Sequence, residues 1–247
     1  MNQGILFVAM TFLPLLSCKK DEADDPVVLP PTQVPVKVMV EFKNNGGAYD
    51  FSSYIEDANG RSVQFNKVRM ILSNFKLISV NGSVSHAFPI TAVLLDRALG
   101  QYVVSDLGLA DQGLFARLAF DIGLDAATNQ MSPSEFTQPP LSDQTLWINA
   151  ASGHKFFTLE GRVDSDGDGI VESSEQVVTY QCITSAMLRS DELNMNTSIS
   201  GSPWTFVITV DMTNILNGFD CITTPTAVGS GAVNAQLMSN LQAAIHV

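Results

Sequence analysis

Apolar and polar side chains alternate along residues 36–43, a two-residue period that is typical of a β-strand buried on one face. The apolar positions of this run are Val36, Val38, Val40 and Phe42. Comparable runs of β-branched, aromatic and aliphatic residues occupy 66–80, 90–95, 114–122, 155–163, 176–183 and 204–211. Turn sequences such as Asn59-Gly60 and Asn81-Gly82 separate them.

Many strands without alternating helices predict an all-β fold, namely an immunoglobulin-like antiparallel β-sandwich. Helical spacing of apolar residues appears only near the end, over residues 233–245, and predicts a short C-terminal helix. Hydrophobic residues make up 45% of the chain and charged residues 15%, which is enough apolar surface for a folded core. The net charge of −12 argues against a nucleic-acid partner, because phosphate binding needs a basic surface.

The first 17 residues contain no charged side chain and are apolar from Ile5 to Leu16. This run is too short for a transmembrane helix and predicts a signal peptide. Residues 15–18, Leu-Leu-Ser-Cys, resemble a bacterial lipobox, in which cleavage precedes a cysteine that becomes lipid-modified, here Cys18. The alternative is an ordinary secretory signal with an unrelated cysteine. A lipidated Cys18 would attach the protein to a membrane without spanning it.

Residues 18–35 are predicted to form a tether before a single domain of residues 36–247. Two lysines and then acidic residues follow Cys18, in a pattern that resembles the export signal of some surface lipoproteins of Gram-negative bacteria. Four prolines in 26–35 favour an extended polyproline-like spacer. We therefore expect an exported lipoprotein of the outer membrane that is displayed at the cell surface; the sequence does not identify a protein partner.

Cys182 and Cys221 form an even pair in a chain predicted to be exported, so a disulfide between them is expected. It would close a loop of about 39 residues and stabilise the fold by roughly 3–4 kcal/mol in the chain-entropy model. The alternative is two buried free thiols.

Residues 164–175, DSDGDGIVESSE, match the twelve-residue calcium-binding loop. Acidic residues occupy positions 1, 3 and 5, glycine takes position 6, and a glutamate stands at position 12. The expected calcium ligands are Asp164, Asp166, Asp168, the Ile170 carbonyl, Glu172 and Glu175. Both flanking segments are predicted strands, so we expect a structural calcium site at a hairpin tip rather than a two-helix sensor. The alternative is a flexible acidic turn.

Catalytic signatures are not evident in this sequence. The three histidines, His86, His154 and His246, are far apart, and no GxSxG, HExxH or phosphate-binding glycine loop occurs. A binding or structural protein is therefore expected rather than an enzyme.

Several segments, taken in order, resemble the MbnP-like family of copper-binding proteins associated with methanobactin systems. The matching segments are residues 65–78 with Leu72-Ser73-Asn74-Phe75, residues 120–125 followed by Asn129, residues 153–161, and Met238-Ser239-Asn240 near the end. The resemblance covers roughly residues 36–247. It implies an extracytoplasmic β-sandwich in which imidazole holds copper beside an oxidised tryptophan.

The family's tryptophan-containing segment corresponds here to residues 146–152, in which Trp147 takes the expected position only after a shift of one residue. His154 stands where the family usually has tyrosine. The resemblance thus implies a copper site at Trp147 and His154 completed by a histidine from elsewhere, although copper prefers several nitrogen or sulfur ligands and the histidines are few. The alternative is a calcium-stabilised adhesion or protein-interaction module without copper.

Overall fold

The computed structural model describes residues 33–89, 92–100 and 102–247. The predicted signal peptide, Cys18 and most of the predicted tether lie outside these residues. No helix within the described ranges has the length and apolar character needed to cross a membrane.

Strands dominate the described chain, and each predicted run overlaps one of them within the described residues. The strands are β1 (Gln33–Asn44), β2 (Gly47–Ala48), β3 (Ile55–Glu56), β4 (Ser62–Ser79), β5 (Val84–Ala87), β6 (Ala92–Asp96), β7 (Tyr102–Asp111), β8 (Gly113–Ile122), β9 (Trp147–Asn149), β10 (Gly153–Val163), β11 (Gln176–Ile183), β12 (Arg189–Ile199), β13 (Trp204–Asp211), β14 (Thr226–Gly229) and β15 (Ile245–His246). The helices are α1 (Ala126–Gln130) and α2 (Ala232–Ala244). Short 3-10 turns cover Arg97–Leu99, Pro133–Glu135, Gln144–Leu146, Ser185–Met187 and Met212–Asn214.

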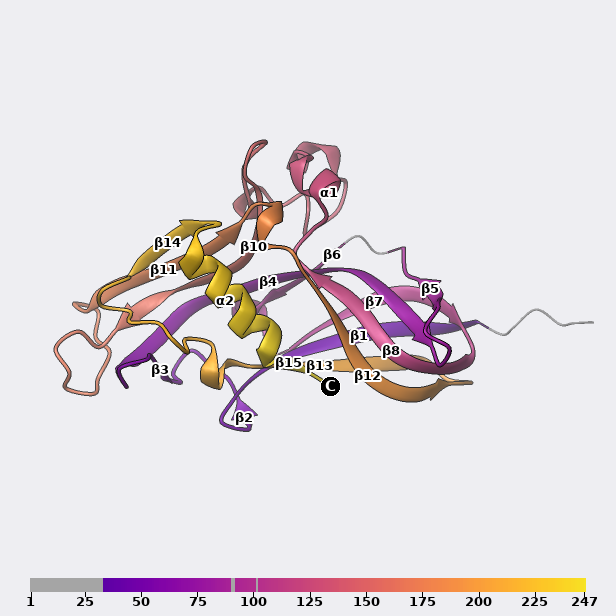
Figure 1. The fold of residues 1–247 in the computed structure, drawn as a ribbon, viewed down its shortest axis with the longest axis horizontal. Coiled ribbons are helices and arrows are strands. Elements are labelled where there is room, and N and C mark those ends of the chain that lie inside the picture. Colours follow the sequence, from indigo (N-terminus) through magenta and orange to yellow (C-terminus); the bar gives the residue numbers. More distant parts are fainter. Residues whose placement is uncertain (1–32, 90–91, 101) are drawn as a thin grey trace, which may run out of the picture. The chain divides into compact units, whose positions relative to one another are not determined.

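The predicted all-β sandwich with a C-terminal helix is confirmed, and its strands form two mixed sheets (Figure 1). The smaller sheet centres on β1, which pairs with β13 in parallel and with β7 antiparallel. The larger sheet runs β12-β8-β4-β10-β11-β14, and only its β11–β14 pair is parallel among the described strands. The inward side chains of β1 are buried, as the alternation predicts. This strand begins at Gln33, so residues 33–35 are paired in the sheet rather than part of the spacer.

Strand β4 organises the larger sheet because β10 and then β8 pair with successive stretches of the same edge of it. Met70 pairs with both β10 and β6, whereas Leu72 pairs with both β8 and β6, so β10 and β8 lie on the same edge. Where they separate, the Gly123 N–H donates to the Ile71 carbonyl at 2.8 Å, and the Ser73 hydroxyl donates to the Gly123 carbonyl at 2.6 Å. Gly123 has φ +105°, and a Cβ there would lie 2.3 Å from the Phe156 ring.

Two of the segments that carry the family resemblance meet at this junction. Asn74 adopts φ +57°, a conformation that asparagine tolerates better than most residues, and its amide donates to Asp121 at 2.8 Å. Asp125 accepts from the backbone N–H groups of Ala127 and Thr128 and so caps α1. These motifs therefore fix the point along β4 at which its partner on this edge changes from β10 to β8.

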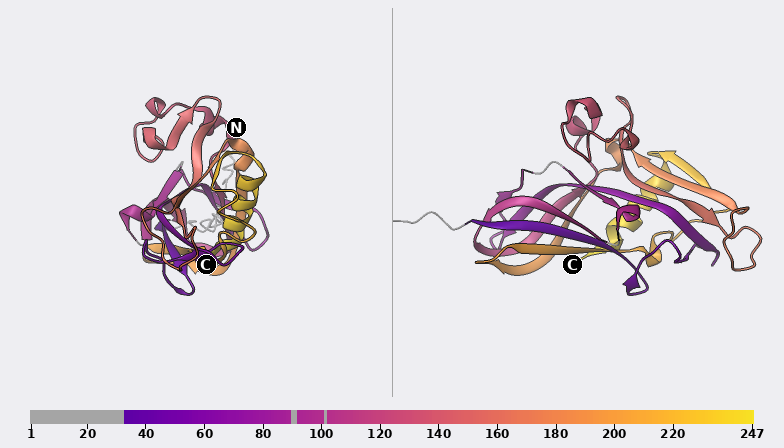
Figure 2. Two further views of the ribbon diagram at one scale, coloured as in Figure 1. Left: turned by 90° about the vertical axis from the view of Figure 1, so that its left-hand side faces the viewer. Right: turned by 180° about the vertical axis from the view of Figure 1, so that it is seen from behind.

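Helix α2 packs against β11, β13 and β14 through buried Leu237, Met238 and Leu241. At its start, the Asn234 amide donates to the carbonyls of Gln181 and Gly229. The segment that contains α1 and leads to β9 projects beyond the sheets in each view (Figure 2).

Eight of the described strands were not predicted, namely the long β7 and β12 and the short β2, β3, β5, β9, β14 and β15. Strand β12 lies at an edge of the described sheet, where it pairs with β8, and most of its side chains are polar and at least partly exposed. Its sequence, RSDELNMNTSI, therefore has little of the apolar alternation that predicts a strand.

Candidate metal sites

The acidic loop joins β10 to β11, which are antiparallel neighbours from Lys155↔Ile183 to Val163↔Gln176. Its flanks are thus strands, and the loop forms the tip of a hairpin. The loop begins at a fixed point, because the Asp164 N–H donates to the Ser62 carbonyl at 2.8 Å.

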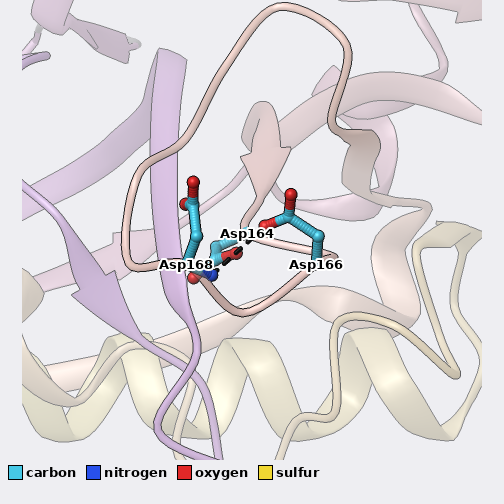
Figure 3. Close-up of side chains that lie close together, drawn as sticks. All are labelled: Asp164, Asp166 and Asp168. Atoms are coloured by element: carbon cyan, nitrogen blue, oxygen red, sulfur yellow. Dashed lines mark hydrogen bonds between the residues drawn. The ribbon is translucent and has the colours of Figure 1, made fainter.

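The carboxylates of Asp164, Asp166 and Asp168 come together in this loop, each offering a ligand oxygen within 4.8 Å of the others. Figure 3 shows Asp164 between the other two side chains, along one turn of the loop. Asp164 is buried, whereas Asp166 and Asp168 are exposed. Oxygen atoms this close repel one another when ionised, and a hard divalent cation neutralises that repulsion.

Backbone groups orient the buried Asp164. Its two carboxylate oxygens accept from the N–H groups of Gly167 at 2.7 Å and Gly169 at 2.9 Å. Burial raises the pKa of Asp164, but these hydrogen bonds outweigh it and hold the pKa below its ordinary value. Both glycines have positive φ, +82° and +87°, which L side chains rarely adopt.

The remaining predicted ligands lie in the same loop but outside this group of three. Glu175 is buried, and its Oε2 accepts from the Ser165 backbone N–H at 2.6 Å and from the Ser165 hydroxyl. Its Oε1 has no hydrogen bond to the described residues and remains available as a ligand. Ile170 and Glu172 are exposed.

Arg61 supports the loop from outside and was missed by sequence reasoning. Its guanidinium donates to the Asp164 carbonyl at 3.0 Å. A groove of about 430 Å³, lined in part by Asn59, Arg61, Asp164 and Asp220, runs beside this contact. No local motif links Arg61 to a loop that lies 103 residues further along the chain.

His154 and Trp147 lie together, as the resemblance implies. Their ring centroids are 4.8 Å apart with an interplanar angle of 64°. His154 is fully buried, its backbone N–H donates to Asn129 at 2.8 Å, and its Nε2 lies 3.5 Å from the Leu141 carbonyl. Its Nδ1 has no partner among the described residues. Burial lowers the pKa of His154, so the imidazole is neutral near pH 7.

The other two histidines lie on different strands. His86 is on β5, which pairs with β4 opposite Leu77, on the edge of β4 away from β10. His246 is exposed on β15, in the smaller sheet, beside Thr209. The structure therefore brings neither of them to Trp147. Among the described histidine, cysteine and acidic side chains, the aspartate group is the one cluster of three with metal-binding geometry.

The predicted disulfide is wrong for this structure: Cys182 and Cys221 are both free and buried. The two thiols have different neighbours. Cys182 donates to the Asn234 carbonyl on α2 at 3.7 Å, whereas Cys221 accepts from the Tyr180 hydroxyl at 3.4 Å. An even number of cysteines does not bring their side chains within bonding distance, and here each thiol is part of the hydrophobic core.

Comparisons with known proteins agree with the predicted family. The model of the MbnP family matches residues 34–234. Among solved structures, the chain is similar to MbnP from Methylosinus trichosporium, with 16% sequence identity and a TM-score of 0.51 over 82% of each chain. At this identity the likeness shows the fold alone. No curated protein matches the chain.

Proposed function

The chain belongs to the MbnP family. From its lipobox-like sequence and the geometry of its acidic loop, we propose that it is an outer-membrane lipoprotein, anchored through Cys18 at the cell surface, whose sandwich domain binds calcium at Asp164–Glu175. Calcium is a structural ion in this proposal. The domain then acts as a calcium-stabilised binding or adhesion module.

The observation that carries the calcium site is the convergence of Asp164, Asp166 and Asp168 within 4.8 Å. Calcium suits this arrangement because it accepts six to eight oxygen ligands in loose geometry. Glu175 Oε1, the Ile170 carbonyl and Glu172 would supply further oxygens after a modest movement of the exposed half of the loop. Binding would fix the tip of the β10–β11 hairpin.

Copper, the metal that the family resemblance implies, fits the described residues less well. The Trp147 region supplies one imidazole, that of His154, and neither His86 nor His246 lies on an adjoining strand. Copper at a single buried imidazole would lack the further nitrogen or sulfur donors that it prefers. We therefore propose that the protein binds calcium and holds no resident copper.

Metal analysis of the purified protein tests this proposal. After loading with both metals and gel filtration, we expect about one calcium per chain and no stoichiometric copper. Calorimetry should show Ca²⁺ binding that Asp166→Ala abolishes. Asp106→Ala is a matched control, because Asp106 is an exposed acid on β7 whose only described ion pair is with Lys37. Absence of Ca²⁺ uptake by the wild-type protein, or stoichiometric copper in it, would contradict the proposal.

The lipid anchor has a separate test. Metabolic labelling with a palmitate analogue should modify the wild-type chain and not the Cys18→Ser variant, and the wild type alone should fractionate with the outer membrane. Equal labelling of both chains would refute the anchor and leave the calcium site unaffected.

A further inference from the structure

Three cations gather in one small pocket of this acidic protein. Lys67 and Arg69 on β4 and Lys155 on β10 line a cavity of about 240 Å³, which the 3-10 turn Gln144–Leu146 and Trp147 cover from the side. The whole chain has only 13 lysines and arginines against 25 acids, so this grouping is unusual for its composition.

The strand register explains why the cations are adjacent. On the outward face of the larger sheet, Lys67 lies opposite Glu160 and Arg69 opposite Thr158. Lys67 pairs with Glu160 at 2.5 Å, and Arg69 pairs with buried Asp96 at 2.7 Å. Lys155 makes no ion pair with a described residue, and its ammonium donates only to the Thr145 carbonyl at 3.1 Å.

Most of the hydrogen-bond donors in the pocket are unused by the protein. Within the described chain, Lys67 uses one of its three N–H donors, Lys155 one of three and Arg69 two of five. Burial and the neighbouring charges of Lys67 and Arg69 lower the pKa of Lys155, against the opposing effect of Glu160. An anion bound here would accept the unused donors and relieve the repulsion among the cations.

The other walls of the pocket define the rest of the ligand. The lining of the pocket is mostly polar, although Trp147 is part of it. Gln144, Thr158 and Glu160 offer groups that hydrogen-bond hydroxyls. A volume of about 240 Å³ is below the range typical of drug-sized ligands, so the occupant is small.

We propose that this pocket binds a small organic carboxylate of the sugar-acid class, with the carboxylate between Lys155 and Arg69 and the hydroxyls toward the polar side chains of the other walls. The site is independent of the calcium loop, which lies at the opposite end of β10.

Calorimetry of the purified protein in a carboxylate-free and phosphate-free buffer tests the proposal, with D-glucuronate as the probe. We expect saturable one-to-one binding of D-glucuronate, no binding of D-glucose, and at least tenfold weaker binding of acetate. Lys155→Gln should raise the Kd for D-glucuronate at least tenfold. Lys76→Gln, on β4 like Lys67 and Arg69 but outside the pocket, should leave the Kd unchanged.

Fluorescence localises the binding, since the chain has only two tryptophans. In a Trp204→Phe background the remaining emission comes from Trp147, and D-glucuronate should change it with the same Kd. Asp166→Ala should retain this response even though it loses calcium. Absence of saturable D-glucuronate binding, equal affinity for acetate, or an unchanged Kd in Lys155→Gln would each overturn the assignment.

Discussion

The indole of Trp147 lies edge-on to the imidazole of His154, with the ring centroids 4.8 Å apart. His154 is fully buried, whereas Trp147 is half-buried and also lines the pocket that contains Lys67, Arg69 and Lys155. The family resemblance implies a copper site at these two side chains that a further histidine completes, and in the structure the two rings pack directly against each other.

The burial of His154 predicts a pH dependence of stability. The pKa of His154 is lowered in the folded state. As the pH falls through the ordinary histidine value of about 6.5, the unfolded chain therefore binds a proton at this position before the folded chain does. Acidification through that range therefore favours unfolding. We expect the melting temperature of the wild type to fall more steeply between pH 7.5 and 5 than that of His154→Phe. Parallel curves for the two proteins would show that His154 does not contribute.

Two aspartates of the acidic loop 164–175 should differ in their effect on stability. Asp164 holds the N–H groups of Gly167 and Gly169, so Asp164→Ala should lower the melting temperature by several degrees even in EDTA. Exposed Asp166 has mainly a ligand role, so Asp166→Ala should remove only the stabilisation added by Ca²⁺. Thermal denaturation in EDTA and in excess Ca²⁺ measures both effects, and identical behaviour of the two variants would contradict this division of roles.

The cysteines should react only after unfolding. Burial raises the pKa of the Cys182 thiol to about 12 and that of Cys221 to about 11, so both are protonated and inaccessible at pH 8. Without reductant, a thiol reagent should label neither in the native protein and both in denaturant. A lipidated Cys18 has no free thiol, so three labelled thiols per chain in denaturant would argue against the lipid anchor. No labelled thiol in denaturant would instead indicate a disulfide between Cys182 and Cys221.

Gly161 should tolerate no side chain. A Cβ at this position would lie 2.1 Å from the Gln64 carbonyl oxygen, where β10 and β4 shift register. Backbone atoms cannot move aside as a flexible side chain can, so Gly161→Ala should destabilise the fold by about 3 kcal/mol, the upper end of ordinary overpacking. Gly47→Ala, whose nearest contact is an ordinary 3.7 Å, is the control. Equal urea midpoints for the two variants would contradict the close approach.

The strands with a clear apolar pattern and the hairpin position of the acidic loop were predictable from sequence because each depends on a local pattern. The alternation in β1 and the twelve-residue spacing from Asp164 to Glu175 are visible without tertiary information. Strand β12 was missed because an exposed edge strand has little apolar alternation to reveal it. Its pairing with β8 depends on a partner far away in the chain.

The parts of the sites that sequence could not supply depend on pairs of distant residues. Arg61 reaches the acidic loop because β4, which it precedes, pairs with β10, and the register of the same two strands brings Lys67 and Arg69 to Lys155. The error over Cys182 and Cys221 has the same origin, since residue counting carries no information about which side chains face each other.

The parallel pairing of β1 with β13 has a consequence for the order of folding. The two strands are joined from Val36↔Trp204 to Lys43↔Asp211, so the centre of the smaller sheet needs both the beginning and the end of the domain. Contacts this remote in sequence form slowly, because a long loop must close before they contribute. A growing polypeptide cannot complete this sheet until β13 has been synthesised, and until then the apolar face of β1 stays available to chaperones.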